Sequence, residues 1–407
     1  MKYEFRDGIA EEEYRAFLAS FGSYSIMQDP SWAAVKTSWQ HDLVGLYADG
    51  KLVAGALVLR RRLLPGATLL YAPRGFVMDY SDADAVRAFT EGIRRYARRR
   101  HAYLVRIDPP IVLSDRHLDT VTENAAGKEQ LETLVSLGYR HKGFARDFQS
   151  YTQPRYYADI LLTKPDGTPM TDAELSSSVS RRARKLMGTH ASEKGIFFEA
   201  RTGSDAAKEF ADVIRHTEQR KGILLRDEAY FERVSQAFGD RCEFVFGKMD
   251  LNRFLSWVDT RENTENNEAD RAAAEDLRQR YGDVVTMCAT LCVSVSDTAN
   301  LLYGGFNDEV FPRYSGAVAM RFDLMKHCRD RGLKWMSLMG IHGDLQDSLS
   351  EFKLKFNPHI VEYAGEFDLP CNRLVYGVMD RLFPVAKRVF LRLSRKKRAK
   401  ETSVQNR

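Results

Sequence analysis

The sequence predicts an α/β protein built from two successive units, each a mixed sheet covered by helices. Strand-like apolar runs alternate with helix-like stretches up to residue 110, and the same alternation returns after residue 176. A polar, alanine-rich segment, 250–283, interrupts the second unit. The chain of 407 residues has room for two domains and a small insert, because one domain takes about 100–200 residues.

The first unit opens with an expected hairpin and continues with strand, helix and strand. Two apolar runs in LVGLYADGKLVAGALVLRR, 43–61, flank a D-G dipeptide, which favours a two-residue hairpin turn. ATLLYAPRG, 67–75, is a strand that ends in a loop with Pro and Gly. Residues 82–100 place apolar side chains at helical spacing, and AYLVRIDPP, 102–110, is a buried strand stopped by two prolines.

The second unit repeats this order with different residues. Helices are expected over 176–189, 205–220 and 316–331, strands over CEFVFGKM (242–249) and LKWMSLMGI (333–341), and a hairpin over 284–306. Segment 250–283 is too polar to join a core but has enough alanine for two short helices, which project as an arm. DLQDSLSEFKLKF, 344–356, contains a short helix, and residues 373–393 have the spacing of an amphipathic helix that Pro384 kinks or restarts.

Composition predicts a soluble protein of the cytoplasm. Hydrophobic residues make up 44% and charged residues 29% of the chain. No run of about 18 apolar residues occurs, and the N-terminus lacks the apolar stretch of a secretory signal. The five cysteines are expected to be buried, unpaired and free of zinc: Cys242, Cys288, Cys292, Cys328 and Cys371.

Positive charge is concentrated in two places, although the net charge is only +5. One is the C-terminal tail with Arg395, Lys396, Lys397 and Arg398. The other is the arginine-rich end of the helix expected over 82–100. Such clusters suit RNA or anionic lipid headgroups, so the tail is a candidate contact for RNA or for an anionic membrane surface. A solvated helix face and a frayed tail are the simpler interpretation.

Several common active-site motifs are absent from the sequence. There is no GxxxxGK[ST] loop, HExxH, GxSxG or cluster of metal-ligand residues. Nucleotide hydrolysis, a metal and a cofactor are therefore not expected. His342 lies between glycines in a loop, but the sequence offers it no partner.

Three stretches place charge beside aromatic or apolar residues. In SIMQDPSWAAVK, residues Gln28, Trp32 and Lys36 recur at spacing four, so we expect them on one helical face, where Lys36 could hold a phosphate. YAPRG and YLVRIDPP place Arg74 and Asp108 at strand ends, where α/β folds bind ligands. In SEFKLKF, two lysines flank an apolar stripe. They either form a solvated helix face or stabilise the negative charge that develops in a reaction.

These stretches together resemble the FemABX family of peptidoglycan aminoacyltransferases. The similarity runs from QDPSWAAVK through YAPRG, RIDP, SRRARK, and HTEQRKG with Arg226 and Tyr230. It ends with LYGGF, WMSLMGIHGD, EFKLKF and EYAGEF. No single piece is specific, but their order over more than 300 residues is.

The resemblance implies a fold of two tandem GNAT-like (acetyltransferase-like) domains with a short helical arm inserted in the second. Residues 1–150 would form the first domain, completed by a C-terminal helix at 372–400, and residues 151–371 the second, with the arm at 250–283 and a basic tail at 395–407. It implies transfer of an amino acid from aminoacyl-tRNA to the stem peptide of a peptidoglycan precursor, either lipid II or UDP-MurNAc-pentapeptide.

The resemblance also implies residue roles. Lys36, Arg226 and Tyr230 would bind the precursor phosphates, with Trp32 and Arg74 in the same substrate site. Tyr103 and Asp108 would lie near the acceptor amine, and Lys353 near the reacting ester, with Lys353 and Asp108 as the catalytic pair. The chain departs from the family pattern in two places. Lys355 could take the role near the reacting ester in place of Lys353, and the arm is shorter than the helical hairpin of many family members.

The residues by themselves are also compatible with two other functions. An acyl-CoA-dependent GNAT N-acyltransferase would share the fold, and RHKGFA, 140–145, matches an (R/Q)xxGx(G/A) pyrophosphate loop. That segment follows a predicted helix and precedes a predicted strand, which is the wrong context for such a loop. The basic tail also fits a non-enzymatic RNA- or lipid-binding protein.

Overall fold

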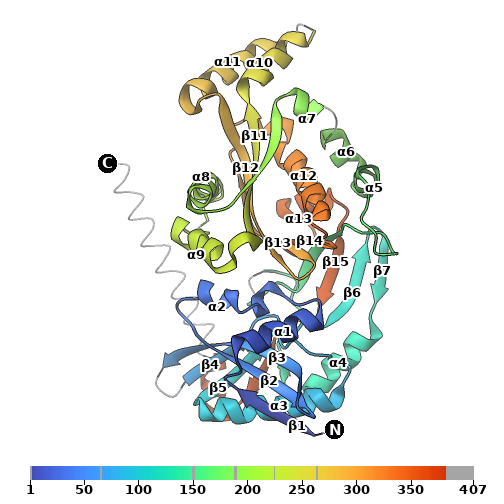
Figure 1. Ribbon diagram of the computed structural model, residues 1–407, viewed down its shortest axis with the longest axis vertical. Coiled ribbons are helices and arrows are strands. Elements are labelled where there is room, and N and C mark those ends of the chain that lie inside the picture. The colour runs from blue at the N-terminus through green and yellow to red at the C-terminus, as the bar shows by residue number, and fades with distance from the viewer. Residues whose placement is uncertain are drawn as a thin grey trace.

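Two mixed β-sheets carry the fold and lie one above the other along the longest axis of the molecule (Figure 1). This computed structural model describes residues 2–381, except 65–66, 149–151, 188–189, 224 and 263–264. The first sheet has seven strands in the order β1-β2-β3-β4-β5-β16-β8. The second has nine strands in the order β10-β11-β12-β13-β14-β9-β15-β6-β7.

The first sheet is built mainly from the N-terminal third of the chain. Its strands are β1 (Tyr3–Asp7), β2 (Gln40–Ala48), β3 (Lys51–Leu64), β4 (Ala67–Ala72), β5 (Ala102–Ile107), β8 (Arg140–His141) and β16 (Phe367–Pro370). Its helices are α1 (Glu11–Phe21), α2 (Ser31–Val35), α3 (Ala83–Arg99) and α4 (Ala125–Ser136), with the 3-10 helix η1 (Ile26–Gln28). The predicted D-G hairpin joins β2 to β3, with positive φ at both Asp49 and Gly50.

The second sheet carries most of the remaining elements. Its strands are β6 (Val112–His117), β7 (Thr120–Glu123), β9 (Tyr156–Leu161), β10 (Ile196–Arg201), β11 (Cys242–Asp250), β12 (Val284–Val295), β13 (Thr298–Phe306), β14 (Trp335–Ile341) and β15 (His359–Tyr363). Its helices are α5 (Asp172–Ser178), α6 (Arg181–Met187), α7 (His190–Glu193), α8 (Ser204–Lys221), α9 (Glu228–Phe238), α12 (Gly316–Asp330) and α13 (Ser348–Leu354), with the 3-10 helices η2 (Gly239–Arg241) and η3 (Pro312–Tyr314).

The two sheets exchange strands across residue 150, where the sequence divides the domains. Strands β6 and β7 precede that residue but pair into the second sheet, because β6 runs antiparallel to β15. Strand β16 lies late in the chain but pairs with β5 of the first sheet. Strand β8 also pairs into the first sheet, so the chain crosses between the sheets four times, which ties the two units together.

The arm consists of α10 (Leu251–Thr260) and α11 (Glu265–Tyr281), which project beyond the second sheet (Figure 1). The prediction of two short helices is confirmed, but the expectation that they avoid a core is wrong at their base. Phe254 and Leu277 are buried in the core of the second unit, and the Phe254 ring lies 4.5 Å from that of Phe311 between centroids. Apolar positions spaced along a mostly polar helix suffice to anchor it.

The start of the C-terminal helix lies against the first sheet. Residues 373–381 are helical, and the described chain ends there, so the rest of the helix expected at 372–400, Pro384 and the basic tail lie outside the described residues. Tyr376 is buried against Tyr103 and donates a hydrogen bond to Asp368 at 3.1 Å. None of the helices among the described residues is long and apolar enough to cross a membrane.

The cysteines agree with the sequence prediction except at one position. All five are free thiols. Cys242, Cys288, Cys292 and Cys328 are buried, whereas Cys371 is partly exposed because it begins the turn into the C-terminal helix.

Candidate functional site

Two cations and two phenols gather where α2 of the first unit packs against α9 of the second. Lys36 directly follows α2, and its Nζ lies 4.4 Å from the centroid of the Trp32 ring. The Arg226 guanidinium lies 5.0 Å from the Tyr230 ring centroid, and the Tyr303 hydroxyl donates a hydrogen bond to the Tyr230 hydroxyl at 3.5 Å. Burial, together with the positive charge of Arg226, lowers the pKa of Lys36 to about 8. Two like charges held this close favour an anion between them.

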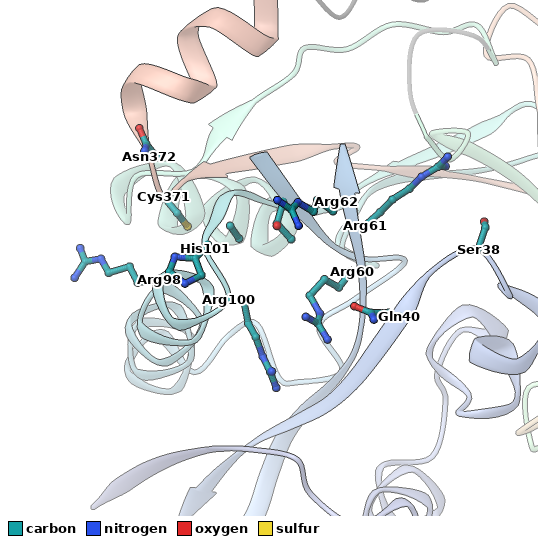
Figure 2. A pocket seen from close by; sticks show the side chains of 12 residues that line it. Ser38, Gln40, Arg60, Arg61, Arg62, Arg98, Arg100, His101, Cys371 and Asn372 are labelled. Atoms are coloured by element: carbon teal, nitrogen blue, oxygen red, sulfur yellow. The ribbon is translucent and has the colours of Figure 1, made fainter. Parts of the chain in front are cut away.

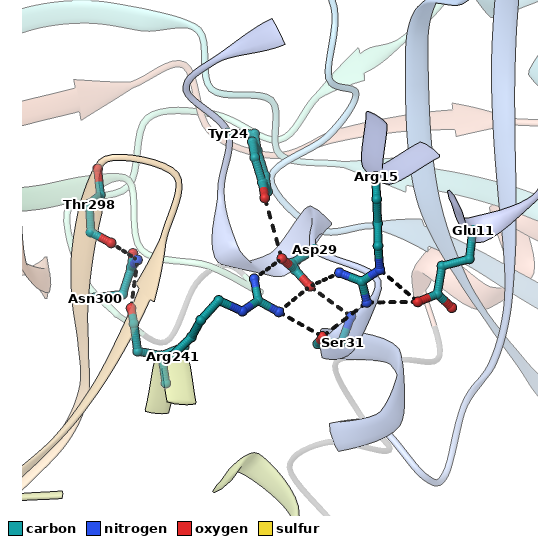
Figure 3. Close-up of polar contacts among 9 residues, drawn as sticks. Glu11, Arg15, Tyr24, Asp29, Ser31, Arg241, Thr298 and Asn300 are labelled. Carbon is teal, nitrogen blue, oxygen red and sulfur yellow. Dashed lines mark hydrogen bonds and ion pairs between the residues drawn. The ribbon is translucent and has the colours of Figure 1, made fainter. Parts of the chain in front are cut away.

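A buried ion pair holds these two units in register (Figure 3). Asp29, just before α2, accepts a hydrogen bond from Arg241 of the second unit at 2.6 Å and from the Ser31 backbone N–H at 2.9 Å. Burial alone would raise the pKa of Asp29, but the hydrogen bond and charge of Arg241 bring it below its ordinary value. The pair fixes α2, and therefore Lys36, against the second unit.

The expectation that Gln28, Trp32 and Lys36 share one helical face is wrong for Gln28. The chain is extended at Asp29, so η1 ends before α2 begins. Gln28 is instead buried, where its side chain accepts from the Leu57 backbone N–H and donates to the Pro73 carbonyl at 2.7 Å. It braces the loop that carries Arg74 rather than facing a ligand.

Asp108 and Arg74 form the second group of the site, at the ends of β5 and β4. Asp108 is 1% exposed. It accepts hydrogen bonds from the Arg74 backbone N–H at 2.5 Å and from the Tyr71 hydroxyl at 2.9 Å. Burial raises the pKa of Asp108 to about 6, although Arg74 opposes that shift. The Arg74 guanidinium lies over the rings of Tyr157 and Tyr363, at 4.4 and 4.5 Å from their centroids.

Lys353 supplies a third group, at the point where β13 and β14 separate. These parallel strands pair over only three residues, Thr298 to Asn300 with Trp335 to Ser337. Lys353 is 8% exposed and its Nζ donates to the Gly340 carbonyl at 2.5 Å. Burial, with the charge of Arg321, lowers the pKa of Lys353 to about 7. A lysine that exchanges its proton near neutral pH can stabilise charge or transfer a proton.

Asp159 in β9 connects the two predicted catalytic residues and was not predicted from the sequence. Burial raises its pKa to about 6, and Ser337, Arg74 and Lys353 oppose the shift. Asp159 therefore lies within the electrostatic reach of both Lys353 and Arg74, and the Arg74 backbone in turn binds Asp108. The signal was present in the sequence, since a carboxylate inside the apolar run YYADILL is rarely found without a partner.

Arg321 in α12 is the second residue that sequence reasoning missed. Its guanidinium is buried, and of its nitrogens Nε and Nη1 have no hydrogen-bond partner while Nη2 donates to Thr290 at 3.3 Å. Burial lowers the pKa of Arg321 to about 10. Its charge helps to keep Lys353 partly unprotonated at neutral pH.

Three other predicted residues lie apart from this group. Tyr103 is the second residue of β5, five positions and about 16 Å of extended chain before Asp108, and packs on Tyr376. Lys355 ends α13 with its Nζ 5.6 Å from the Phe352 ring centroid, while Lys353 is the lysine that turns inward. The His342 ring lies edge-on to Phe148, 4.3 Å between centroids.

The described residues offer one group with the spacing of metal ligands. Ligand atoms of His342, Asp344 and Asp347 lie within 4.8 Å of one another. Asp347 caps α13 by accepting from two backbone N–H groups, and Asp344 accepts from the Gln346 N–H. Capping accounts for both carboxylates, so we assign no metal site.

The RHKGFA segment does not have the context of a pyrophosphate loop. Arg140 and His141 form β8, which pairs with β16. In the described residues from there to Tyr156 no helix begins, so no helix N-terminus is available to bind a phosphate.

The two-unit α/β fold thus carries a buried lysine, a buried carboxylate and a partly buried carboxylate, Lys353, Asp108 and Asp159, which are groups suited to the proton transfers of acyl transfer. The FemAB family model matches residues 9–276 and 258–382, and the chain therefore belongs to the FemAB family. It is 27% identical to lipid II:glycine glycyltransferases of Staphylococcus aureus strains bovine RF122 / ET3-1 and MRSA252, with 96% of this chain and 99% of each relative covered.

A solved structure supports the same assignment. The crystal structure of FemX matches with a TM-score of 0.76 and 25% sequence identity, covering 93% of this chain and 100% of FemX. The predicted family membership and the predicted fold class, two α/β units with a helical arm in the second, are confirmed.

Proposed function

We propose that this protein transfers an amino acid from aminoacyl-tRNA to the stem peptide of lipid II, at the inner face of the plasma membrane, and so builds the peptidoglycan interpeptide bridge. The observation that carries the proposal is the presence in one chain of two neighbouring cations, Lys36 and Arg226, and of a largely buried group formed by Lys353, Asp159 and Asp108. It occurs in a chain that aligns over nearly its whole length with lipid II:glycine glycyltransferases.

The acceptor's pyrophosphate would lie between Lys36 and Arg226. Both are cationic, and the aromatic rings of Trp32 and Tyr230 hold them in place. The same hydrophobic cluster contains Trp32, Tyr71 and Tyr230, so the proposed phosphate site and the Asp108 site share one rigid support. This rigidity would fix the acceptor amine relative to the reacting ester.

In the proposed reaction the acceptor amine nitrogen attacks the ester carbonyl carbon of the aminoacyl group. The carbon–oxygen bond to the tRNA ribose then breaks, and the proton lost by the amine ends on the ribose hydroxyl. Protonated Lys353 would stabilise the tetrahedral oxyanion, and Asp108 would orient the amine or accept its proton. With pKa values of about 7 and about 6, both groups can change protonation near neutral pH.

The proposal is tested by incubating the protein with tRNA charged with a labelled amino acid and with lipid II in detergent. We expect label in lipid II, and its loss after ribonuclease treatment of the tRNA. UDP-MurNAc-pentapeptide in place of lipid II tests the soluble acceptor. Acyl transfer from acetyl-CoA without tRNA, or no transfer from any charged tRNA, would overturn the proposal.

Acceptor affinity should depend on pH through Lys36, whose pKa is about 8 in the free protein. Only protonated Lys36 attracts a phosphate, so affinity should be constant below about pH 7 and fall by up to about tenfold per pH unit above 8. Titration of UDP-MurNAc-pentapeptide binding across this range measures the effect. Lys36→Met should weaken binding about 10–100-fold.

Lys36→Arg is the matched control for this titration, because a guanidinium stays charged throughout the range. The decline in affinity should disappear in that variant. If Lys36→Arg shows the same decline as the natural protein, another group controls acceptor binding.

A further inference from the structure

A basic pocket of about 920 Å³ opens on the first unit, at the opposite end of β4 and β5 from Asp108 (Figure 2). Strand β3, the C-terminal end of α3 and the turn into the C-terminal helix form its walls. The residues that line it are Ser38, Gln40, Arg60, Arg61, Arg62, Thr68, Arg98, Arg100, His101, Ala102, Cys371 and Asn372. Five of these are arginines and none is acidic.

Most of this charge is not neutralised by the protein. Asp42, behind the wall, pairs with Arg100 at 2.9 Å and with Arg60 at 3.6 Å. Arg61 lies 5.6 Å from the Trp39 ring centroid. In the described part of the chain, Arg62 and Arg98 have no carboxylate partner. A concave site with several unpaired arginines is built for a phosphate-bearing anion.

Exposed apolar side chains lie beside this pocket. Leu374 and Val378, which follow Asn372 by two and six residues, are 84% and 57% exposed on the helix at 373–381. They lie four residues apart and therefore share one helical face. Leu64, at the end of β3, is 55% exposed, and its neighbour Leu63 packs against the same helix. Large exposed apolar side chains next to a basic pocket are typical of a surface that meets a membrane.

We propose that this pocket binds the phosphate headgroup of an anionic membrane lipid, while Leu374, Val378 and Leu64 contact the acyl boundary. The site is distinct from the Lys36 and Lys353 groups, and its role rests on the proposed function because lipid II is itself in the membrane. A volume of about 920 Å³ suits one compact headgroup, whereas an RNA helix would need an extended surface.

The position of the pocket suits this role. Ser38 on its rim is two residues from Lys36, and the Trp39 N–H donates to the Lys36 carbonyl at 2.8 Å. The Trp39 ring also packs on Tyr71, the hydroxyl of which binds Asp108. A headgroup in the pocket would therefore hold the membrane surface beside Lys36, where the lipid-linked pyrophosphate has to arrive.

The test is co-sedimentation of the full chain with vesicles of phosphatidylcholine and phosphatidylglycerol, without lipid II or tRNA. The variant R61Q/R62Q/R98Q should bind about 100-fold more weakly at low salt, since each cation near an anionic surface contributes about fivefold. L374S/V378S should also bind more weakly, both to neutral vesicles of phosphatidylcholine alone and to vesicles that contain anionic phosphatidylglycerol. All of these side chains lie at the surface, so both variants are expected to fold, which their melting temperatures check.

A matched control removes three exposed cations elsewhere on the first unit, as K51Q/R87Q/K128Q. This control should keep nearly full vesicle binding. If it loses as much vesicle binding as R61Q/R62Q/R98Q, net charge alone explains the effect and the proposal is overturned. Loss of tRNA binding with intact vesicle binding in R61Q/R62Q/R98Q would also overturn it, in favour of RNA. Transfer to lipid II in detergent is measured separately, so failure of the proposed function and failure of the pocket are distinguishable.

Discussion

Replacing Lys353 by Met is expected to lower turnover by about 10²–10³-fold, with little change in acceptor affinity. Met has nearly the length of Lys but no charge, so it removes the proposed stabiliser of the tetrahedral oxyanion and leaves the apolar packing in place. In the described part of the chain the hydrogen bonds of the Lys353 Nζ go to the Met339 and Gly340 carbonyls, not to groups of the Lys36 and Arg226 site, so the phosphate site should survive. Single-turnover transfer and equilibrium binding of the acceptor, measured on one preparation, separate the two effects.

The pH dependence of turnover gives a second readout of Lys353. Its pKa of about 7 means that the protonated form is lost as the pH rises through neutrality. Wild-type turnover should therefore contain a component that falls above about pH 7, and Lys353→Met should lack it. Lys355→Met is the matched control, because Lys355 lies over Phe352. If Lys355→Met loses turnover and Lys353→Met does not, the assignment of the catalytic lysine is wrong.

Local turn chemistry explains why the hairpins were predictable and the strand exchange was not. The D-G dipeptide determines the β2–β3 turn by itself, because both residues adopt positive φ there. The pairing of β16 with β5 joins segments more than 250 residues apart, as between Asp368 and Arg106. No local pattern encodes such a partner, since pairing of this kind depends on the whole fold.

The error at Gln28 has a local cause. Its spacing of four from Trp32 suggested one helix, but Asp29 and Pro30 lie between the two residues. A residue before proline avoids the helical region, and Asp29 is extended with ψ 133°. That break turns Gln28 toward the core, leaves Trp32 on the new helix and places Lys36 directly after it.

The polar core of the site was predicted only where a motif marked it. Lys353 and Asp108 lie in motifs, but the burial that shifts their pKa values depends on distant elements. Lys353 turns inward because β14 is irregular next to Gly340, with positive φ at Met339, and so presents two carbonyls to its Nζ. Asp159 belongs to no motif, and only the assembled sheet brings it near Lys353.

Asp108→Asn is expected to lower turnover by about 10²–10⁴-fold, the range of a lost proton-transfer group. The amide cannot take the proton of the acceptor amine, and its NH₂ replaces one accepting oxygen, so the hydrogen bond donated by the Tyr71 hydroxyl or by the Arg74 N–H is lost. The free energy of unfolding should fall by about 1–3 kcal/mol for that unmade hydrogen bond. Turnover and denaturant unfolding of the same variant measure both quantities.

Tyr71→Phe separates a chemical role of Asp108 from a positioning role. It removes the 2.9 Å hydrogen bond to Asp108 but leaves the carboxylate and its 2.5 Å bond from Arg74 intact. Without the Tyr71 hydroxyl, which stabilises the charged form, the pKa of Asp108 should rise further. Turnover in Tyr71→Phe should therefore decline mainly at low pH and approach the natural rate at high pH, whereas Asp108→Asn should stay low throughout. If both variants lose turnover equally at every pH, Asp108 acts by holding the Arg74 loop and another group takes the proton.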